Sequence, residues 1–246
     1  MTIHYHPSIE MLTDYAAGSL SLTHSMSIAT HIEQCQECQQ QIRKLTTLGA
    51  QLFTQTATED ANIVDLKASF FDKLRELDRS EGISSPVKEQ GHRDQSTGQM
   101  ASEETLPSWE QDYQVPKSLR QFVPFGYDKL KWMSLSPSVK IATLYQEEGG
   151  AQVALTRIKA GASIPTHTHT GDEITLVLEG AFSDKSGIYR RGDFITRDAS
   201  HKHKPMVTKD AKCICLTVLD SPIEFTGWLT RLFNPIMRRY HPHSNH

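Results

Sequence analysis

The chain has 246 residues, of which 37% are hydrophobic and 22% charged, and 26 Lys and Arg against 29 Asp and Glu give a net charge of −3. This length fits one large domain or two of ordinary size, and the acidic balance argues against a general nucleic-acid binder, which would present a basic face. No apolar run approaches the ~18 residues of a membrane helix, and no secretory signal opens the chain, so a cytoplasmic protein is expected.

Residues 1–79 predict a helical region. Ser8 and Ser21 stand where two N-caps are expected, and Gly18 stands where the first helix would end. A second helix is predicted from Leu22 to about Gln34, and a third begins near Glu37. A fourth helix is predicted from an apolar stripe at i, i+3/i+4 spacing, formed by Ile63, Leu66, Phe70, Leu74 and Leu77.

The pattern changes twice after this region. Residues 80–106 contain almost no large apolar side chain and predict a flexible linker, because such a segment cannot bury enough surface to fold. Residues 107–246 contain short β-branched runs between turn residues, among them Val153–Lys159, Glu173–Glu179 and Cys213–Leu219, which favour an all-β sandwich or barrel. The sequence therefore predicts a multidomain α + β protein, with a helical domain at 1–79, a linker at 80–106 and a β domain at 107–246.

The first candidate metal site lies in the stretch THIEQCQECQQ. His31 and Cys35 are four residues apart on one helix face, and Cys38 follows just past the predicted helix break. Zinc takes four nitrogen or sulfur ligands in structural sites, so one more donor is required, and His4, His6 and His24 are the candidates. The four cysteines form two closely spaced pairs, which is a poor disulfide framework. The alternatives are buried helix cysteines, or a redox motif, which would need a βαβ context.

His6 followed by the spacing His31-x3-Cys35-x2-Cys38 resembles the motif of zinc-binding anti-sigma factors. Those are small helical domains that wrap around extracytoplasmic-function sigma factors. The resemblance implies a zinc ion held by His6, His31, Cys35 and Cys38. It also implies that the fourth predicted helix clamps the sigma factor. An ordinary bundle helix would show the same periodicity.

The second candidate metal site matches the first cupin motif, G-x5-H-x-H-x3-E-x6-G, between Gly161 and Gly180. His167 and His169 are two residues apart, so on a strand both imidazoles face the same side, and Glu173 returns a carboxylate after a turn. His201 and His203 have the same strand parity, so periodicity leaves the fourth ligand open. The resemblance implies a double-stranded β-helix, or jelly-roll, barrel, and its spacing favours His203. Three histidines and a carboxylate suit zinc or another divalent transition metal. Surface histidines without a metal are the alternative.

Cys213 and Cys215 alternate on a predicted strand and therefore face the same side. They could act as sensing thiols or simply be buried strand cysteines.

The combination of a zinc-binding helical domain and a C-terminal cupin resembles ChrR-type anti-sigma factors over nearly the whole chain outside the linker. The resemblance implies a negative regulator of transcription, not an enzyme, whose partner is an extracytoplasmic-function sigma factor and which touches neither nucleic acid nor membrane. It further implies that singlet oxygen or organic oxidants act through the cupin to free the sigma factor. The alternative is a metal-dependent cupin dioxygenase with a helical zinc-binding appendage. A regulator that binds DNA directly is disfavoured by the net charge.

Overall fold

The computed structural model describes residues 2–56, 115–148 and 150–227, with six further positions at 69, 72, 73, 232, 234 and 235. Residue contacts group Met1–Thr47 with Gln111–His246 in one compact unit and place Leu48–Glu110 in another. Apart from those isolated positions, the predicted fourth helix and the predicted linker lie outside the described residues. The domain boundaries at 79 and 107 stay a prediction.

Three helices open the chain: α1 (Ile9–Ala17), α2 (Leu22–Ile32) and α3 (Gln36–Thr56). The predicted caps are confirmed. The Ser8 hydroxyl accepts the Met11 N–H, the Ser21 hydroxyl accepts the His24 N–H, and Gly18 ends α1 in the left-handed conformation with φ 70°. Among the residues described, no helix combines the length and the hydropathy that crossing a bilayer requires.

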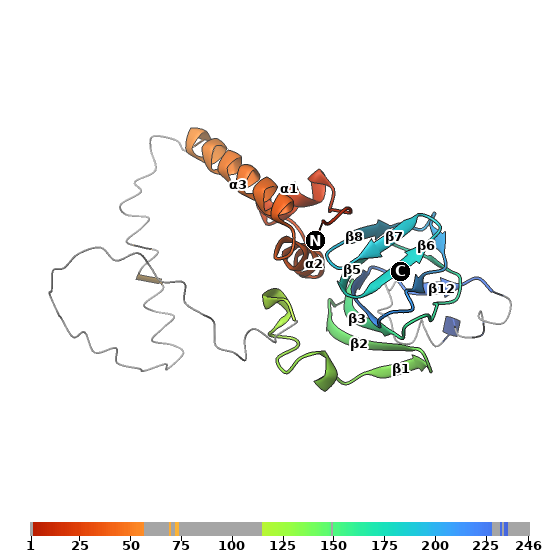
Figure 1. The fold of residues 1–246 in the computed structure, drawn as a ribbon. Helices are drawn as coiled ribbons and strands as arrows, with labels where there is room; N and C mark the ends of the chain where they lie inside the picture. Colours follow the sequence, from red (N-terminus) through yellow and green to blue (C-terminus); the bar gives the residue numbers. More distant parts are fainter. Residues whose placement is uncertain are drawn as a thin grey trace, which may run out of the picture. The chain divides into compact units, whose positions relative to one another are not determined.

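The C-terminal part is β-rich, as predicted, and every strand pair in it is antiparallel (Figure 1). Two short 3-10 helices, η1 (Lys117–Leu119) and η2 (Tyr127–Lys129), lead into it. The strands are β1 (Met133–Ser136), β2 (Val139–Gln146), β3 (Gln152–Ile158), β4 (His167–His169), β5 (Glu173–Glu179), β6 (Ala181–Asp184), β7 (Gly187–Arg190), β8 (Phe194–Arg197), β9 (Lys202–His203), β10 (Met206–Val207), β11 (Cys213–Leu219) and β12 (Ile223–Phe225).

Hydrogen bonding arranges the described strands in three sheets. One has the order β1-β2-β3-β11-β5-β8, the second β10-β6-β7 and the third β12-β4-β9. The third sheet brings His167 on β4 opposite His203 on β9, although 36 residues separate them in the sequence. The closed barrel implied by the cupin resemblance stays a prediction.

Both faces of the six-stranded sheet are buried. Successive side chains of β11 point alternately to one face and to the other. Ile214 and Leu216 pack in one apolar cluster, whereas Cys213 and Cys215 pack in the other. The first cluster also includes the fully buried Ile28 of α2, and α2 contacts β5 and β11. The second helix therefore shares a hydrophobic core with the outer face of the sheet, beside β5 in Figure 1.

Candidate metal centres

The N-terminal cluster joins four side chains from the chain start and from the corner between α2 and α3: His6, His31, Cys35 and Cys38. His31 lies in the last turn of α2, Cys35 lies in the connection, and Cys38 lies in the first turn of α3. Their donor atoms all lie within 4.8 Å of one another. The structure thus brings together the four residues that the resemblance implies.

The spacing of these donors fits zinc. His6 Nδ1 lies 3.3 Å from Cys35 Sγ and 3.5 Å from Cys38 Sγ, and His31 Nε2 lies 3.3 Å from Cys38 Sγ. Ligand atoms about 2.0–2.3 Å from a tetrahedral zinc ion lie about 3.3–3.8 Å apart. Two imidazoles and two thiols at this spacing can hold one zinc ion.

Burial sets the protonation states in this cluster. It lowers the pKa of His31 to about 4, so the imidazole is neutral at pH 7 and keeps one lone pair for a metal. Burial, reinforced by the neighbouring Cys35, raises the pKa of Cys38 to about 12. Without a cation the Cys38 thiol therefore stays protonated, and metal binding must release its proton. Acid should consequently weaken metal retention at this cluster.

A backbone carbonyl of the cupin-like domain orients one of these histidines. His31 Nδ1 lies 2.8 Å from Gly192 O, and because a carbonyl only accepts, Nδ1 carries the proton and Nε2 presents its lone pair to Cys38. Gly192 has φ 91°, and a Cβ at this position would collide with the side chain of Ile3. Glycine is therefore required in the turn between β7 and β8 that supplies the carbonyl.

The next residue in that turn anchors the start of the chain. Asp193 is 1% exposed, and its Oδ1 accepts the backbone N–H groups of His4 at 2.8 Å and Tyr5 at 3.2 Å. Its Oδ2 accepts the Arg190 N–H at 2.7 Å, which closes the turn. These bonds fix the segment immediately before His6. The single β7–β8 turn therefore positions both histidines of the N-terminal cluster.

The second cluster lies inside the cupin-like domain and contains His167, His169 and His203, with Glu173 beside it. His203 Nε2 lies 2.9 Å from His167 Nε2 and 3.2 Å from His169 Nε2. Glu173 Oε2 lies 3.0 Å from His169 Nε2 and 3.9 Å from His203 Nε2. Octahedral neighbours about 2.1 Å from a metal lie about 3.0 Å apart, so most of these separations suit a shared ion.

The orientation of two rings supplies a further test of metal binding. His167 Nδ1 lies 2.9 Å from Pro165 O, and His203 Nδ1 lies 3.2 Å from Asp184 Oδ2. Both partners accept, so each Nδ1 carries the proton and each Nε2 presents a lone pair. Two lone pairs that face each other at 2.9 Å repel unless a cation lies between them. The cluster could therefore hold a metal ion.

Burial keeps the histidines of this cluster neutral, so that their nitrogen lone pairs can bind a cation. It lowers the pKa of His167 to about 4 and that of His169 to about 3, so both imidazoles are neutral at pH 7. The same desolvation raises the pKa of Glu173 to about 7. Among the described residues, the buried Nδ1 of His169 has no hydrogen-bond partner, and the buried Oε2 of Glu173 has none apart from its contact with His169 Nε2. A divalent ion would compensate the desolvated carboxylate.

A buried polar chain leads from this cluster toward the N-terminal segment. Asp184 contacts His203 Nδ1 through Oδ2 and accepts the Tyr189 hydroxyl at Oδ1, 3.2 Å away. Arg197 Nη2 lies 3.1 Å from Asp184 Oδ2 and 2.6 Å from the Tyr189 hydroxyl. The Tyr189 ring packs on Tyr5, with centroids 4.8 Å apart. Tyr5 adjoins His6, so contiguous contacts run between the two clusters.

The remaining sequence candidates lie away from both clusters. His4 is exposed, and His24 lies 3.8 Å from Asp220. His201 pairs with Asp198 at 2.8 Å, and its side chain is 44% exposed. His203, rather than His201, therefore faces the other cupin histidines.

The sequence did not identify the groups that orient the ligands, namely Asp184, Gly192 and Asp193. No local spacing in the sequence connects Gly192 or Asp193 to His31 or His6. Cys213 and Cys215 are both buried with their sulfur atoms 3.6 Å apart, and the contact with Cys213, together with desolvation, raises the pKa of Cys215 well above its ordinary value. The structure thus places the two thiols side by side, and their role stays open between the two predicted readings.

The chain resembles known proteins along almost its whole length. The family model described as "ChrR Cupin-like domain" matches residues 121–221. A protein named Anti-sigma-E factor ChrR, from Cereibacter sphaeroides, is 32% identical over 239 residues, which cover 97% of this chain and 100% of the relative. The crystal structure of Rhodobacter sphaeroides SigE in complex with the anti-sigma ChrR matches at 28% identity with a TM-score of 0.66, covering 89% of this chain and 100% of that one.

The N-terminal ligand set can be tested through zinc content. We predict that His6→Ala and Cys38→Ser each lower the bound zinc by about one ion per chain, because three remaining ligands cannot close a tetrahedral structural site. His4→Ala is the matched control, since His4 is exposed and its contact with Asp193 uses only the backbone. Elemental analysis of the purified full-length variants is the measurement. Unchanged zinc in both ligand variants would contradict the assignment.

Asp193→Ala should speed the loss of zinc from the same cluster. The substitution removes the acceptor of three backbone N–H groups and loosens the segment that carries His6. Loss of a group that orients the ligands of a metal typically lowers metal affinity by about 10- to 100-fold. Zinc transfer to a chromophoric chelator measures the rate, and Asp198→Ala, at an exposed acid that pairs with His201, is the control. Equal transfer rates for Asp193→Ala and wild type would show that the turn does not position the ligands.

Proposed function

The chain belongs to the family of ChrR-type anti-sigma factors, and from this premise we propose that it binds an extracytoplasmic-function sigma factor and keeps it from RNA polymerase. The observation that carries the proposal is the full-length match to a protein named as an anti-sigma factor, which includes the helical region as well as the cupin-like domain. A structural relative with both parts is seen in complex with SigE.

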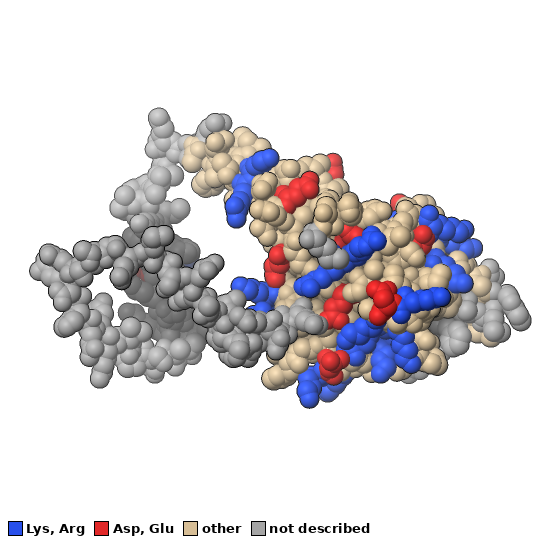
Figure 2. Space-filling view, viewed as in Figure 1, with Lys and Arg blue, Asp and Glu red and all other residues tan. Residues whose placement is uncertain are grey.

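The surface of the helical region supports a protein partner. On α3, Leu48 is 52%, Leu52 54% and Phe53 76% exposed, which places large apolar side chains on one stretch of helix. Exposed apolar surface of this kind is typical of docking sites for other proteins. Figure 2 shows basic and acidic side chains interspersed among the described residues of the visible face. The predicted clamp at Ile63–Leu77 remains part of this proposal.

We assign zinc to His6, His31, Cys35 and Cys38, and zinc or another divalent transition metal to His167, His169, Glu173 and His203. The two sites differ in chemistry. Two thiols and two imidazoles can complete a closed tetrahedral site, and zinc bound there would contribute to the stability of a helical region with few buried apolar residues. Three imidazoles and one carboxylate leave positions open in a six-coordinate ion, so this site can admit a further ligand.

An oxidative signal would enter at the second site and reach the first through the cupin-like domain. Asp184, Tyr189 and Tyr5 form the contiguous contacts between His203 and the segment that ends at His6. A shift of β7 or β8 would move the turn that holds His6 and His31. The helices that bind the sigma factor are built around those ligands. The proposal therefore couples the state of the cupin site to sigma binding through the β7–β8 turn.

The sigma-binding proposal predicts that full-length protein copurifies with an extracytoplasmic-function sigma factor and inhibits sigma-dependent transcription in a purified system. The Cys35→Ser, Cys38→Ser double variant should bind at least about tenfold more weakly, a loss of roughly 1.4 kcal/mol, because the α2–α3 corner loses its zinc ligands. Fluorescence anisotropy with labelled sigma factor gives the affinity, and His4→Ala is the control. A zinc-free double variant that binds sigma normally would overturn the role of the metal.

The signalling proposal predicts separate effects for the cupin site. His167→Ala combined with His169→Ala should still repress in the dark, because the N-terminal ligands are intact, but should fail to respond to singlet oxygen. Sigma-dependent transcription, measured in the dark and under photosensitised light, tests this. His201→Ala is the matched control, since this histidine lies outside the cluster. Derepression of the double variant in the dark would show that the cupin site helps to hold sigma, and a normal light response would place the sensor elsewhere.

A further inference from the structure

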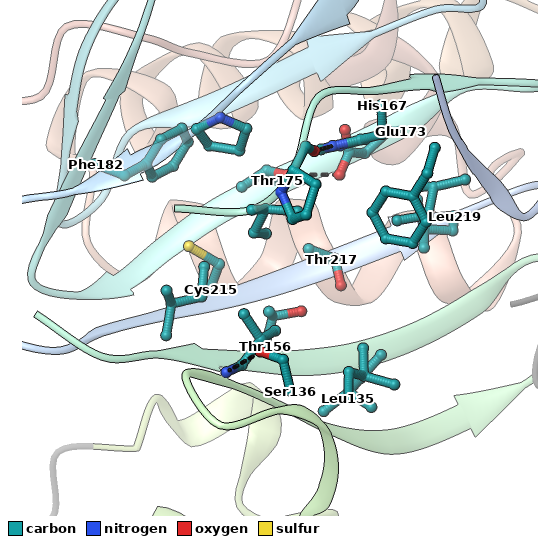
Figure 3. A pocket seen from close by; sticks show the side chains of 18 of the residues that line it. Leu135, Ser136, Thr156, His167, Glu173, Thr175, Phe182, Cys215, Thr217 and Leu219 are labelled. Carbon is teal, nitrogen blue, oxygen red and sulfur yellow. Dashed lines mark hydrogen bonds between the residues drawn. The ribbon is translucent and has the colours of Figure 1, made fainter. Parts of the chain in front are cut away.

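The cupin-like domain contains a cavity of about 430 Å³ beside the second metal cluster (Figure 3). Its walls are mostly apolar and include Leu135, Ile141, Phe182, Leu219 and Phe225. Such walls offer water few hydrogen bonds. A cavity of this size and lining is typical of a site for a small organic molecule.

The carboxylate and the imidazoles of the cavity lie at the metal cluster, whereas polar side chains elsewhere on the wall, such as Ser136 and Thr156, are hydroxyls. His167, Glu173 and His203 line the cavity, and Figure 3 shows His167 and Glu173 together at one side, with Thr217 and Cys215 farther along the wall. No lysine or arginine is among the described residues that line it. A phosphate or a dicarboxylate would enter this cavity with charges that no side chain there could pair.

Charge balance at the cluster selects the head group of the ligand. Neutral imidazoles leave the two positive charges of a divalent ion unchanged, and the single carboxylate of Glu173 offsets one of them. One positive charge then remains in an apolar, buried setting, where an unpaired charge is costly. A single anionic oxygen donor restores neutrality, and an oxygen ligand also suits the open positions of a transition metal.

We propose that this cavity binds a small apolar monocarboxylate, with its carboxylate at the histidine cluster and its hydrocarbon body against the walls formed by β1, β2, β11 and β12. The proposal rests on the metal assignment of the proposed function and names the class of molecule that the same site recognises. Ligand occupancy would then be a second input to the cupin site, besides oxidation. The cavity would select ligands with one anionic end and an apolar body, because only the histidine cluster can pair with a negative charge and the walls are mostly apolar.

Calorimetric titration of the metal-loaded full-length protein with octanoate and with octanol tests the head group. The two probes share the hydrocarbon chain and differ in charge. We expect octanoate to bind at least about tenfold more tightly than octanol, and the His167→Ala, His203→Ala double variant to lose that preference. Equal affinity of the two probes for wild type, or no binding of octanoate, would overturn the proposal.

Ile141→Trp tests the location, because Ile141 lines the cavity and a larger side chain there occupies the space. We expect octanoate binding to fall at least about tenfold. Ile188→Trp is the matched control, since Ile188 is 51% exposed on β7 and does not line the cavity. Leu135→Trp provides an independent cavity-filling variant if Ile141→Trp does not fold. Undiminished octanoate binding by a folded cavity-filling variant would show that the ligand lies elsewhere.

Sigma binding by the same preparations separates this proposal from the function on which it rests. Protein that binds sigma but not octanoate would overturn only the ligand proposal. Protein that binds octanoate with the expected head-group preference, but no sigma factor, would leave the cavity assignment standing and overturn the anti-sigma proposal.

Discussion

The hydrogen bonds of the Asp193 carboxylate are the constraint on which the arrangement of the N-terminal cluster depends. This buried group accepts the backbone N–H of His4, Tyr5 and Arg190, so it closes the β7–β8 turn and anchors the start of the chain at once. Hydrogen bonds to a charged acceptor contribute about 1.5–3 kcal/mol each. The position of His6 is thereby set by a residue almost 190 positions later in the chain.

In both clusters, a hydrogen bond from Nδ1 orients a histidine ring. In each, an Nδ1–H points at an oxygen acceptor, which is Gly192 O for His31, Pro165 O for His167 and the Asp184 carboxylate for His203, and the Nε2 lone pair is thereby directed inward. The clusters differ in what surrounds them. The N-terminal donors are two thiols and two imidazoles packed at a helix corner, whereas the cupin donors border a cavity. The first arrangement suits a structural ion and the second an ion that meets other molecules.

Local structure could be predicted from the sequence, whereas contacts between residues far apart in the sequence could not. Ser8, Gly18 and Ser21 act within one helical turn, so their caps could be predicted from spacing, and the strands at residues 173–179 and 213–219 could be predicted from short β-branched runs between turn residues. Spacing within the sequence also indicated His31, Cys35, Cys38, His167 and His169, whereas the choice of His6 and His203 came from the resemblance to known families. The bond from His31 to Gly192 spans 161 residues, and no periodicity encodes it. The sequence also separated the helical region from the cupin-like domain by composition, whereas residues 1–47 pack with the C-terminal unit because Ile28 and its neighbours complete the core over β5 and β11.

Dependence of two ligands on one turn has a consequence for regulation. A change that displaced a single ligand would leave three donors and a weakened site, whereas a change in the β7–β8 turn acts on His6 and His31 together. Two of the four metal ligands would then move together. A small displacement of β7 and β8 would therefore disrupt the tetrahedral geometry of the N-terminal site. Coupling of this kind is reciprocal in binding free energy. A sigma factor that stabilises the helical region must therefore also bias the turn, and through Tyr5, Tyr189 and Asp184 the orientation of His203. On this argument, sigma-bound and free protein should differ in metal affinity at the cupin site.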